Sequence, residues 1–216
     1  MFGRSERWPE TDMPEDFFVG VDLGQSNDYT AVAVITGLQY HDHYRCVFLE
    51  RVRGIGYPAI IKKIENLVHS EPICMGNLHL VVDKTGLGAP VVDMMFEKNL
   101  NPVGISITGG DKPVRTLLNR WGTRQSWTCP RRDLVTNLLL MSQNNELKIL
   151  DHLPLAQTLL IELMSLRIKI DAVTAHDSYS TGRESEHDDM VLAAALAAWW
   201  TQNRPAPTYV TTPRRA

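Results

Sequence analysis

The chain contains 216 residues, of which 44% are apolar and 22% charged, and its formal net charge is −3. This length fits roughly one domain, and the composition is that of a folded globular protein, which excludes a wholly disordered chain and a fibrous or disulfide-built scaffold. The longest apolar run, residues 190–200, is too short for a membrane span, which needs about 20 residues. Charges and Pro9 occupy the first ten residues, where a signal peptide requires an apolar stretch.

The cysteines give no sign of a disulfide framework or a zinc site. Cys46, Cys74 and Cys129 lie far apart, and none belongs to a CxxC pair. This usage is typical of a reducing compartment. Together with the charged N-terminus, it predicts a soluble cytoplasmic protein.

Charge is distributed unevenly along the chain. Residues 111–132 contain six basic side chains and one acidic side chain, a local net charge of +5, whereas residues 171–189 contain six acids and one arginine, a local net charge of −5. The two segments are either solvated loops or a strip that contacts phosphate groups beside a carboxylate site. The basic residues are Lys112, Arg115, Arg120, Arg124, Arg131 and Arg132.

The first part of the chain predicts three strands. Residues 1–16 are polar, contain two prolines and are expected to form an arm. The segments that follow are rich in Val, Ile and Thr, and turn residues separate them. They span residues 17–23, 29–36 and 43–52. Their short connections predict an antiparallel meander.

The remainder of the chain predicts an α/β arrangement. Helical spacing and short apolar runs indicate helices at 58–70 and 90–98 and buried parallel strands at 78–82 and 103–107. Further helices at 131–143 and 154–166, a short strand at 167–170, a loop at 171–186 and a final helix at 187–202 follow. The final helix is apolar on nearly every face, which is typical of a buried helix. We expect one domain over residues 17–202, with a mixed central sheet covered by helices on both faces, and a tail at 203–216.

Three acidic positions stand out because of where they lie. Asp22 falls in an otherwise apolar strand, Asp83 follows a buried strand, and Asp188 and Asp189 open the final helix. Each has a structural alternative, since Asp also serves in turns and as a helix N-cap. A carboxylate in an apolar strand is costly, however, unless it is paired or bound to a metal. In sheets of this kind, ligands bind beyond the carboxyl ends of the strands.

A cluster of carboxylates without cysteine or histidine ligands favours a hard divalent cation, Mg²⁺ or Mn²⁺. Two such ions about 3.5–4 Å apart can activate water and stabilise the leaving oxygen of a phosphodiester. The acidic positions therefore indicate hydrolysis of nucleic acid.

Three motifs resemble the nuclease domain of phage terminase large subunits, a member of the RNase H-like superfamily. They are FVGVDLG at 18–24 followed by DYTA at 28–31, VVDKTGLG at 81–88, and EHDDMVLA at 186–193. The resemblance covers roughly residues 17–202. It implies an RNase H-like fold whose central sheet has five or more strands and one antiparallel edge. It also implies that Asp22, Asp83 and the Asp188/Asp189 pair hold two metal ions.

The resemblance further implies a function and partners. The function is terminase-type cleavage of concatemeric viral double-stranded DNA during genome packaging, in the cytoplasm of the host cell and with no membrane involved. The partners are double-stranded DNA and, within a packaging complex, an ATPase motor domain, a portal or a small terminase subunit. The sequence contains no GxxxxGK[ST] ATPase motif. An excised domain and a stand-alone relative both remain open.

Other functions remain as alternatives. A Holliday-junction resolvase of the same superfamily fits less well, because those enzymes are commonly basic and this chain has a pI of about 6.2. An actin-like or sugar-kinase-like ATPase lobe would need a second DxG loop, which is absent after residue 24. A non-enzymatic scaffold that has kept the fold would not need the acidic positions.

Residues beside the acidic positions are auxiliary candidates. Lys84 either contacts the scissile phosphate or pairs with a neighbour, and His187 either orients a carboxylate or water or starts the helix. Asp188 and Asp189 point about 100° apart on a helix, whereas Glu186 and Asp189 share a face. We expect Asp189 to be the principal ligand and Asp188 to be an N-cap, a supporting partner or an occasional ligand. Asp22, Asp83 and Asp189 are then the predicted catalytic residues.

Overall fold

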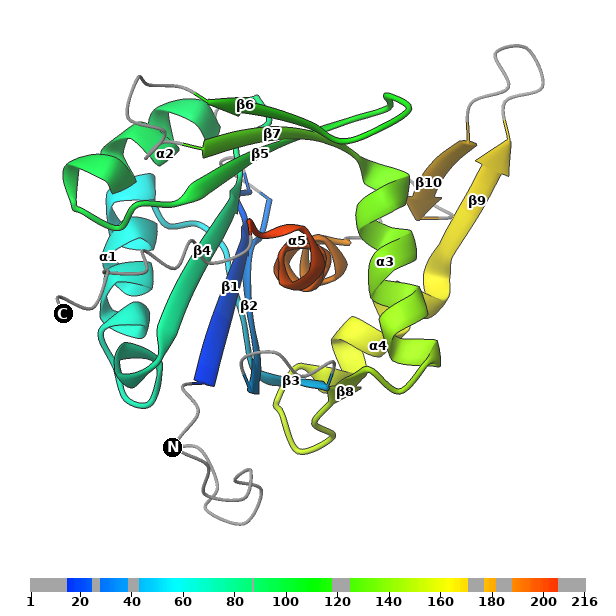
Figure 1. The fold of residues 1–216 in the computed structure, drawn as a ribbon, viewed down its shortest axis with the longest axis horizontal. Helices are drawn as coiled ribbons and strands as arrows, with labels where there is room; N and C mark the ends of the chain where they lie inside the picture. The colour runs from blue at the N-terminus through cyan, green and yellow to red at the C-terminus, as the bar shows by residue number, and fades with distance from the viewer. Residues whose placement is uncertain are drawn as a thin grey trace, which may run out of the picture.

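The computed structural model describes residues 15–24, 28–38, 43–86, 88–117, 125–170, 177–181 and 188–205. Eight strands form one sheet in the order β6-β7-β5-β4-β1-β2-β3-β8, and β9 and β10 form a separate hairpin (Figure 1). The strands of the large sheet are β1 (Glu15–Asp22), β2 (Thr30–Leu38), β3 (Tyr44–Val52), β4 (Asn77–Asp83), β5 (Val103–Thr108), β6 (Val114–Leu117), β7 (Gln125–Pro130) and β8 (Leu147–Ile149). The hairpin consists of β9 (Leu166–Ile170) and β10 (Asp177–Thr181).

Helices cover both faces of the large sheet (Figure 1). Helices α1 (Tyr57–Val68) and α2 (Gly88–Glu97) lie on one face. On the other face lie α3 (Arg131–Gln143), α4 (Ala156–Ser165) and α5 (Asp189–Asn203). A short 3₁₀ helix, Ile73–Met75, precedes β4. This mixed α/β architecture is the one that the sequence predicts.

The pairing of the strands confirms the predicted meander and parallel strands. Strands β1, β2 and β3 pair antiparallel in chain order, whereas β4 pairs parallel with β1 and with β5. Strand β7 continues the parallel set beside β5, and β6 closes that edge in antiparallel fashion. At the opposite edge, β8 pairs parallel with β3.

The sequence patterns do not indicate every strand. They give no strand at β6, β7 or β8, because these segments are short or polar. β8 also depends on pairing with β3, which is distant in sequence. The predicted loop at 171–186 is wrong in part, since residues 177–181 form β10 by pairing with β9. The final helix begins at Asp189 rather than at residue 187. Residues 15 and 16 of the predicted arm belong to β1 instead. The rest of the predicted arm and most of the predicted tail lie outside the described residues.

Successive side chains of β1 alternate between two hydrophobic cores, one on each face of the large sheet. Phe17, Val19 and Val21 pack with α1 and α2, whereas Phe18 packs on the side of α3 and α5. Successive residues of a strand point to opposite faces. Gly20 and Asp22 therefore share the α5 face with Phe18.

Helix α5 is the central buried helix, as its apolar composition predicts. Every residue from Met190 to Thr201 is buried. No helix in the described part of the chain is long and apolar enough to cross a membrane.

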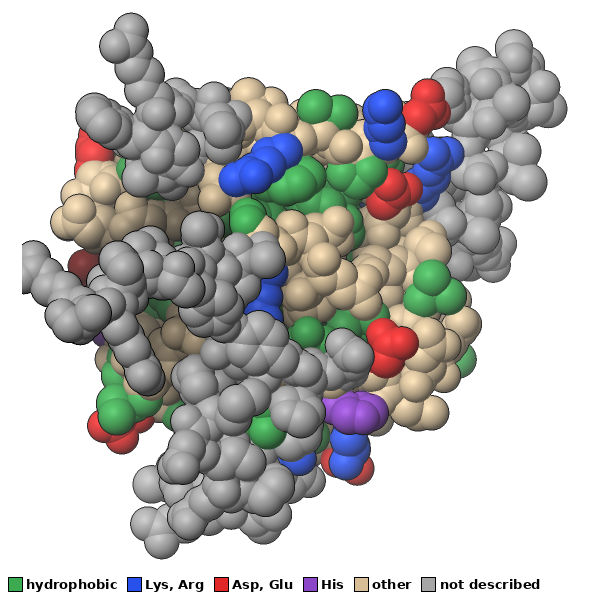
Figure 2. All heavy atoms as spheres, viewed as in Figure 1, with side chains coloured by type: hydrophobic (Ala, Val, Ile, Leu, Met, Phe, Trp, Pro, Cys, Tyr) green, Lys and Arg blue, Asp and Glu red, His purple; other side chains and the backbone are tan. Residues whose placement is uncertain are grey.

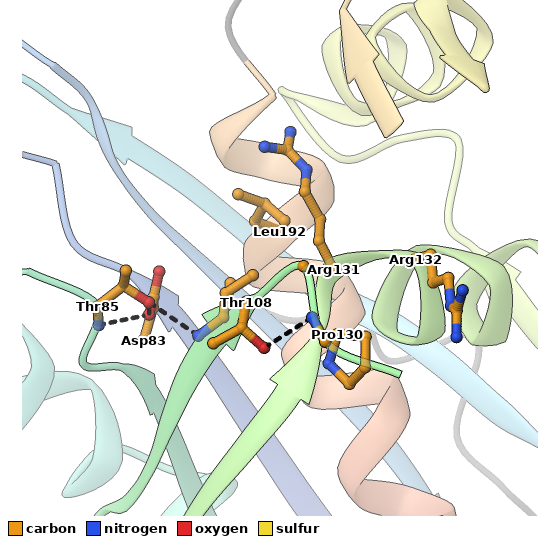
Figure 3. Close-up of a pocket in the computed structure, with 10 residues that line it drawn as sticks. Asp83, Thr85, Thr108, Pro130, Arg131, Arg132 and Leu192 are labelled. Carbon is orange, nitrogen blue, oxygen red and sulfur yellow. Dashed lines mark hydrogen bonds between the residues drawn. The ribbon is translucent and has the colours of Figure 1, made fainter. Parts of the chain in front are cut away.

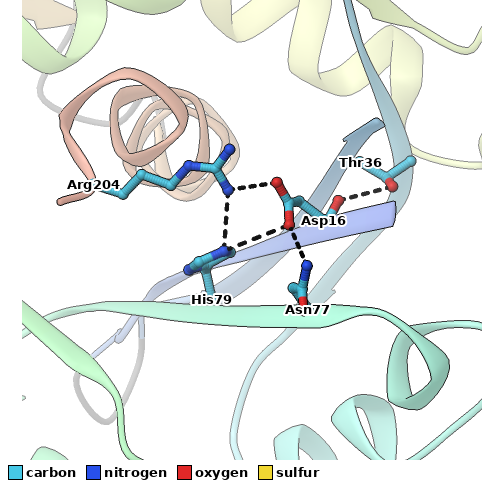
Figure 4. A network of polar contacts seen from close by, with 5 residues as sticks. All are labelled: Asp16, Thr36, Asn77, His79 and Arg204. Atoms are coloured by element: carbon cyan, nitrogen blue, oxygen red, sulfur yellow. Dashed lines mark hydrogen bonds and ion pairs between the residues drawn. The ribbon is translucent and has the colours of Figure 1, made fainter. Parts of the chain in front are cut away.

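A polar network fixes the C-terminal end of α5 to the start of β1 (Figure 4). Arg204 donates to Asp16 Oδ2 at 2.5 Å, and Asn77 Nδ2 donates to Asp16 Oδ1 at 2.9 Å. Asp16 is 1% exposed, so the guanidinium and the amide compensate a buried charge. Burial, followed by the positive charge of Arg204, lowers the pKa of His79 to about 4. The network lies at the opposite end of β1 from Asp22.

Candidate active site

Asp22 and Asp83 end two neighbouring strands of the sheet. Strands β1 and β4 run parallel, and Val21 is in register with Val82, so the two aspartates follow side by side. Asp83 lies two residues beyond Val81, which packs in the α5-side core, so Asp83 shares that face with Asp22. The Asp22 residue is only 8% exposed. The sheet thus brings together two of the predicted ligands.

The start of α5 brings the remaining predicted carboxylates to the carboxyl ends of β1 and β4. Asp189 is the first residue of α5, and Asp188 occupies the N-cap position. Asp189 lies close enough to Asp22 for its charge to raise the Asp22 pKa. The Asp188 side chain makes no capping hydrogen bond and instead forms an ion pair with the guanidinium of Arg131, the first residue of α3. The sequence indicates Asp188 as a possible cap, but its side chain contacts α3 instead.

The electrostatics at the carboxyl ends of β1 and β4 disfavour further negative charge. Burial, followed by repulsion from Asp83 and Asp189, raises the pKa of Asp22 well above its ordinary value. Burial also raises the pKa of Asp83, although hydrogen bonds from Thr85 and the positive charge of Arg131 oppose the shift. A proton or a bound cation would relieve this repulsion.

Thr85 orients the Asp83 carboxylate. Its backbone N–H and its hydroxyl both donate to Asp83 Oδ1, at 2.8 Å and 2.5 Å. The same hydroxyl oxygen accepts the N–H of Ile107 in β5 at 2.8 Å. The threonine in the turn after β4 therefore links the Asp83 carboxylate to the neighbouring strand.

Glu162 in α4 is a further acid of the site that the sequence analysis missed. It is 7% exposed, and its charge raises the pKa of Asp22. Burial raises the pKa of Glu162 to about 7, with Arg51 acting in the opposite direction. A weak signal for its burial exists in the sequence, because Glu162 lies three residues after the buried Leu159 and hence on the apolar side of its helix.

A cavity of about 470 Å³ opens beside Asp83 (Figure 3). Its lining includes Thr85, Thr108, Arg131, Arg132 and Leu192. Figure 3 shows the Arg131 side chain extending toward α5, while Arg132 points away from it. The cavity therefore joins a carboxylate at the end of β4 to the basic start of α3.

The other predicted site residues lie around the carboxyl ends of the strands or on or beside β6, or fall outside the described part of the chain. The aliphatic part of Lys84 lies against Gly104 of β5. Arg132 donates to the Asp111 carbonyl at 2.9 Å, and Lys112 and Arg115 are exposed on or beside β6. Figure 2 shows Lys and Arg side chains beside acidic ones along the edge where β6 and β7 lie. Arg120, Arg124, Glu186 and His187 lie outside the described residues.

The residues at the carboxyl ends of β1 and β4 and at the start of α5 are chemically suited to a hard divalent cation. Among the described residues, no three His, Cys, Asp or Glu side chains come close enough to form a ready-made metal site. The available donors are nevertheless carboxylate oxygens, the ligands that Mg²⁺ and Mn²⁺ prefer. Burial first, and then the charges of Asp83 and Asp189, raise the pKa of Asp22, so its negative form is disfavoured without a counter-charge. A divalent cation would compensate that charge.

Comparisons with known proteins identify the fold. No protein-family model matches the sequence, and no curated protein matches it significantly. The large terminase nuclease from thermophilic phage G20c is similar in structure, with a TM-score of 0.61, 18% identity and coverage of 87% of this chain and 82% of that one. Its structure with bound magnesium gives a TM-score of 0.61, 18% identity and coverage of 86% and 81%. Structures of the same nuclease with bound cobalt or zinc are similar as well.

A longer chain, a large terminase, is also similar in structure over part of its length. The large terminase from the thermophilic bacteriophage D6E gives a TM-score of 0.59 and 12% identity over 89% of this chain. The match spans 41% of the D6E chain. At the level of the fold, these comparisons confirm the resemblance that the three sequence motifs indicate. The chain has the RNase H-like fold of phage large terminase nucleases.

Proposed function

We propose that this chain is a divalent-metal-dependent DNA endonuclease of the terminase type, which cuts concatemeric viral double-stranded DNA during genome packaging in the host cytoplasm. The observation that carries the proposal is the placement of three aspartates. Asp22 ends β1, Asp83 ends the adjacent parallel strand β4, and Asp189 begins the helix packed on their shared face. Burial is the first cause of the raised Asp22 pKa, and the charges of Asp83 and Asp189 add to it.

In this proposal Asp22, Asp83 and Asp189 hold two Mg²⁺ or Mn²⁺ ions, and Asp188 is a supporting ligand. The similar G20c nuclease has been solved with bound magnesium, cobalt and zinc, which supports a divalent cation in this fold. When bound, two such ions supply the positive charge that activates an attacking water and stabilises the leaving oxygen.

Neighbouring residues orient the aspartates and compensate part of their charge. Thr85 holds one oxygen of Asp83, so that the carboxylate keeps a fixed orientation. Arg131 lies among the acids, where it pairs with Asp188 and lowers the pKa of Asp22 and Asp83. The neighbouring cavity has room for a backbone phosphate next to Asp83 and Arg132.

Basic residues of the segment 111–132 provide the proposed DNA contacts. Lys112 and Arg115 are exposed at the β6 side of the sheet, and Arg132 lines the cavity that leads to Asp83. Phosphate contacts of this kind position a duplex without reading its sequence. The further partners that we propose are an ATPase motor domain, a portal or a small terminase subunit, in keeping with the similarity to a larger terminase chain.

Cleavage assays test this function and its alternatives together. Supercoiled plasmid, linear duplex and a four-way junction are incubated with the protein in Mg²⁺, Mn²⁺, Ca²⁺ or EDTA. We expect nicking and linearisation of the plasmid in Mg²⁺ or Mn²⁺ and none in EDTA. Selective cleavage of the junction would support a resolvase instead. Thermal stabilisation by ATP without cleavage of any DNA would support an ATPase lobe.

A further inference from the structure

The buried N-terminus of α5 receives its cap from another helix. Glu162 Oε2 in α4 accepts the backbone N–H of Met190 at 3.0 Å and that of Val191 at 3.3 Å. These are the second and third residues of α5, whose amides an N-cap side chain ordinarily satisfies. Asp188 occupies the N-cap position but makes no such bond. The capping oxygen thus comes from a residue 28 positions away from Met190.

A cation on β3 fixes Glu162 in this place. Arg51 Nη1 donates to Glu162 Oε1 at 2.8 Å, so the two oxygens of the carboxylate serve different partners. The Arg51 guanidinium also lies over the Tyr29 ring, 4.2 Å from its centroid. Because the Glu162 side chain is 8% exposed, this ion pair is shielded from water much more than a surface pair is.

We infer that Glu162 is a positioning residue of the nuclease site: by capping α5 from outside, it holds Asp189 beside Asp22 and leaves the Asp188 carboxylate to face Arg131. The inference rests on the proposed function for its catalytic meaning, whereas the capping contact itself is independent of that function. Without Glu162, two amides at a buried helix end would lack this acceptor. The nearest replacement in sequence is the Asp188 side chain, which would have to leave Arg131 to reach them.

Amide exchange tests the capping in the absence of metal. The exchange rates of the Met190 and Val191 amides are measured by NMR in EDTA for wild type, Glu162→Ala and Glu162→Gln. We expect Glu162→Ala to raise both rates about fivefold or more, the factor that corresponds to the loss of one cap. Glu162→Gln keeps a carbonyl oxygen as acceptor, so its rates should stay closer to wild type. Unchanged rates in Glu162→Ala would overturn the inference.

Glu50→Ala is the matched control for these variants. Glu50 precedes Arg51 in β3 and forms an ion pair of similar length with Lys63, 2.7 Å, but this pair is exposed. Its removal should leave the exchange of both α5 amides unchanged. If Glu162→Ala does not fold, Glu162→Gln and Arg51→Met carry the test. Glu162→Gln keeps Arg51, and Arg51→Met keeps the Glu162 carboxylate. Both are then expected to raise the rates by less than about fivefold, and faster exchange in Glu50→Ala than in either of them would overturn the inference.

Metal affinity and kinetics test whether the capping serves the site. We expect Glu162→Ala to weaken Mn²⁺ binding, measured by calorimetry, by about 10- to 100-fold. The kcat for plasmid nicking should fall while KM for DNA stays constant, and Glu162→Gln should restore most of both losses. A Glu162→Gln variant as impaired as Glu162→Ala would show that the charge acts directly, and would overturn a positioning role. A wild-type protein that neither binds Mn²⁺ nor cuts DNA contradicts the proposed function, and amide exchange still decides the capping.

Discussion

Gly20 of β1 lies directly against the backbone of Ala193 in α5. A Cβ added to Gly20 would overlap the Ala193 carbonyl oxygen and would lie 2.8 Å from the Ala197 amide nitrogen. The absence of a side chain at Gly20 therefore lets the strand and the helix approach closely. Asp22 lies two residues after Gly20, and Asp189 lies one helical turn before Ala193, so this contact helps to set the separation of the two acids.

The first prediction concerns this close approach. Gly20→Ala should destabilise the protein by about 1–3 kcal/mol or more, because an added methyl group in a packed core displaces its neighbours. Urea unfolding measures the change. Gly109→Ala is the control, since a Cβ there meets nothing within 4 Å. Equal stability of the two variants would show that α5 can move away from β1 at little cost.

The second prediction concerns the pH dependence of the metal-free protein. The pKa of Asp22 is raised in the folded state, so the folded protein binds this proton more tightly than the unfolded chain does. Stability should therefore fall as the pH rises above the ordinary value of 3.8 and through the folded pKa. Asp22→Asn removes this charge and should raise the melting temperature in EDTA, by about 2–4 °C for each kcal/mol gained.

Thermal unfolding of both proteins in EDTA at several pH values checks this sign. The advantage of Asp22→Asn over wild type should be small near pH 4 and larger near pH 8. The pKa of Glu162 is raised from 4.5 to about 7 and contributes a loss of stability in the same direction, but this residue is present in both proteins. An advantage that shrinks with rising pH would show that the Asp22 carboxylate is stabilised, rather than strained, by its surroundings.

The third prediction distinguishes the two acids at the start of α5. Asp189→Ala should remove cleavage, because Asp189 lies near Asp22. Asp188→Ala should reduce cleavage only in part, since Asp188 pairs with Arg131. Glu186→Ala should have between no effect and a moderate one. A plasmid-nicking time course at fixed Mn²⁺, with circular dichroism as a check of folding, measures all three. An inactive Asp188→Ala beside an active Asp189→Ala would exchange the two roles.

The fourth prediction concerns DNA binding. Replacing the exposed Lys112 and Arg115 by alanine should weaken binding equally for unrelated duplexes. The dependence of log affinity on log salt should flatten by about 0.9 for each phosphate that the protein no longer neutralises. Fluorescence anisotropy over a salt series measures this slope. Lys62→Ala, a change at an exposed lysine on α1, is the control and should leave the slope as in wild type. An unchanged slope in the double variant would assign these residues to a solvated surface.

The elements that position the aspartates could be predicted from sequence because their signals are local. β1 and β4 are largely apolar and each ends at an acid, and α5 is apolar on nearly every face. Helix α3 begins and ends where the helical spacing predicts, at residues 131 and 143. Burial on both faces of the sheet reinforces each of these patterns, so that local preference and tertiary packing agree.

The features that the sequence did not indicate depend on contacts between distant segments. Strand β8 has only three residues and pairs with β3, about 100 positions away in sequence. Glu162 and Arg51 are 111 positions apart, and neither belongs to a recognisable motif. Arg131, one of the predicted DNA-binding residues, pairs with Asp188, and the sequence does not indicate this contact. Its position at the start of a helix gives no information about which way the side chain turns.

The most direct test of the central claim compares cleavage by wild type and Asp22→Asn. Supercoiled plasmid is incubated with each protein in Mn²⁺ and in EDTA, and DNA binding is measured in parallel. If Asp22, Asp83 and Asp189 form a metal-dependent nuclease centre, wild type nicks and linearises the plasmid only with Mn²⁺. Asp22→Asn should then bind DNA as wild type does but leave the plasmid intact. Cleavage by Asp22→Asn at the wild-type rate in Mn²⁺ would contradict the account.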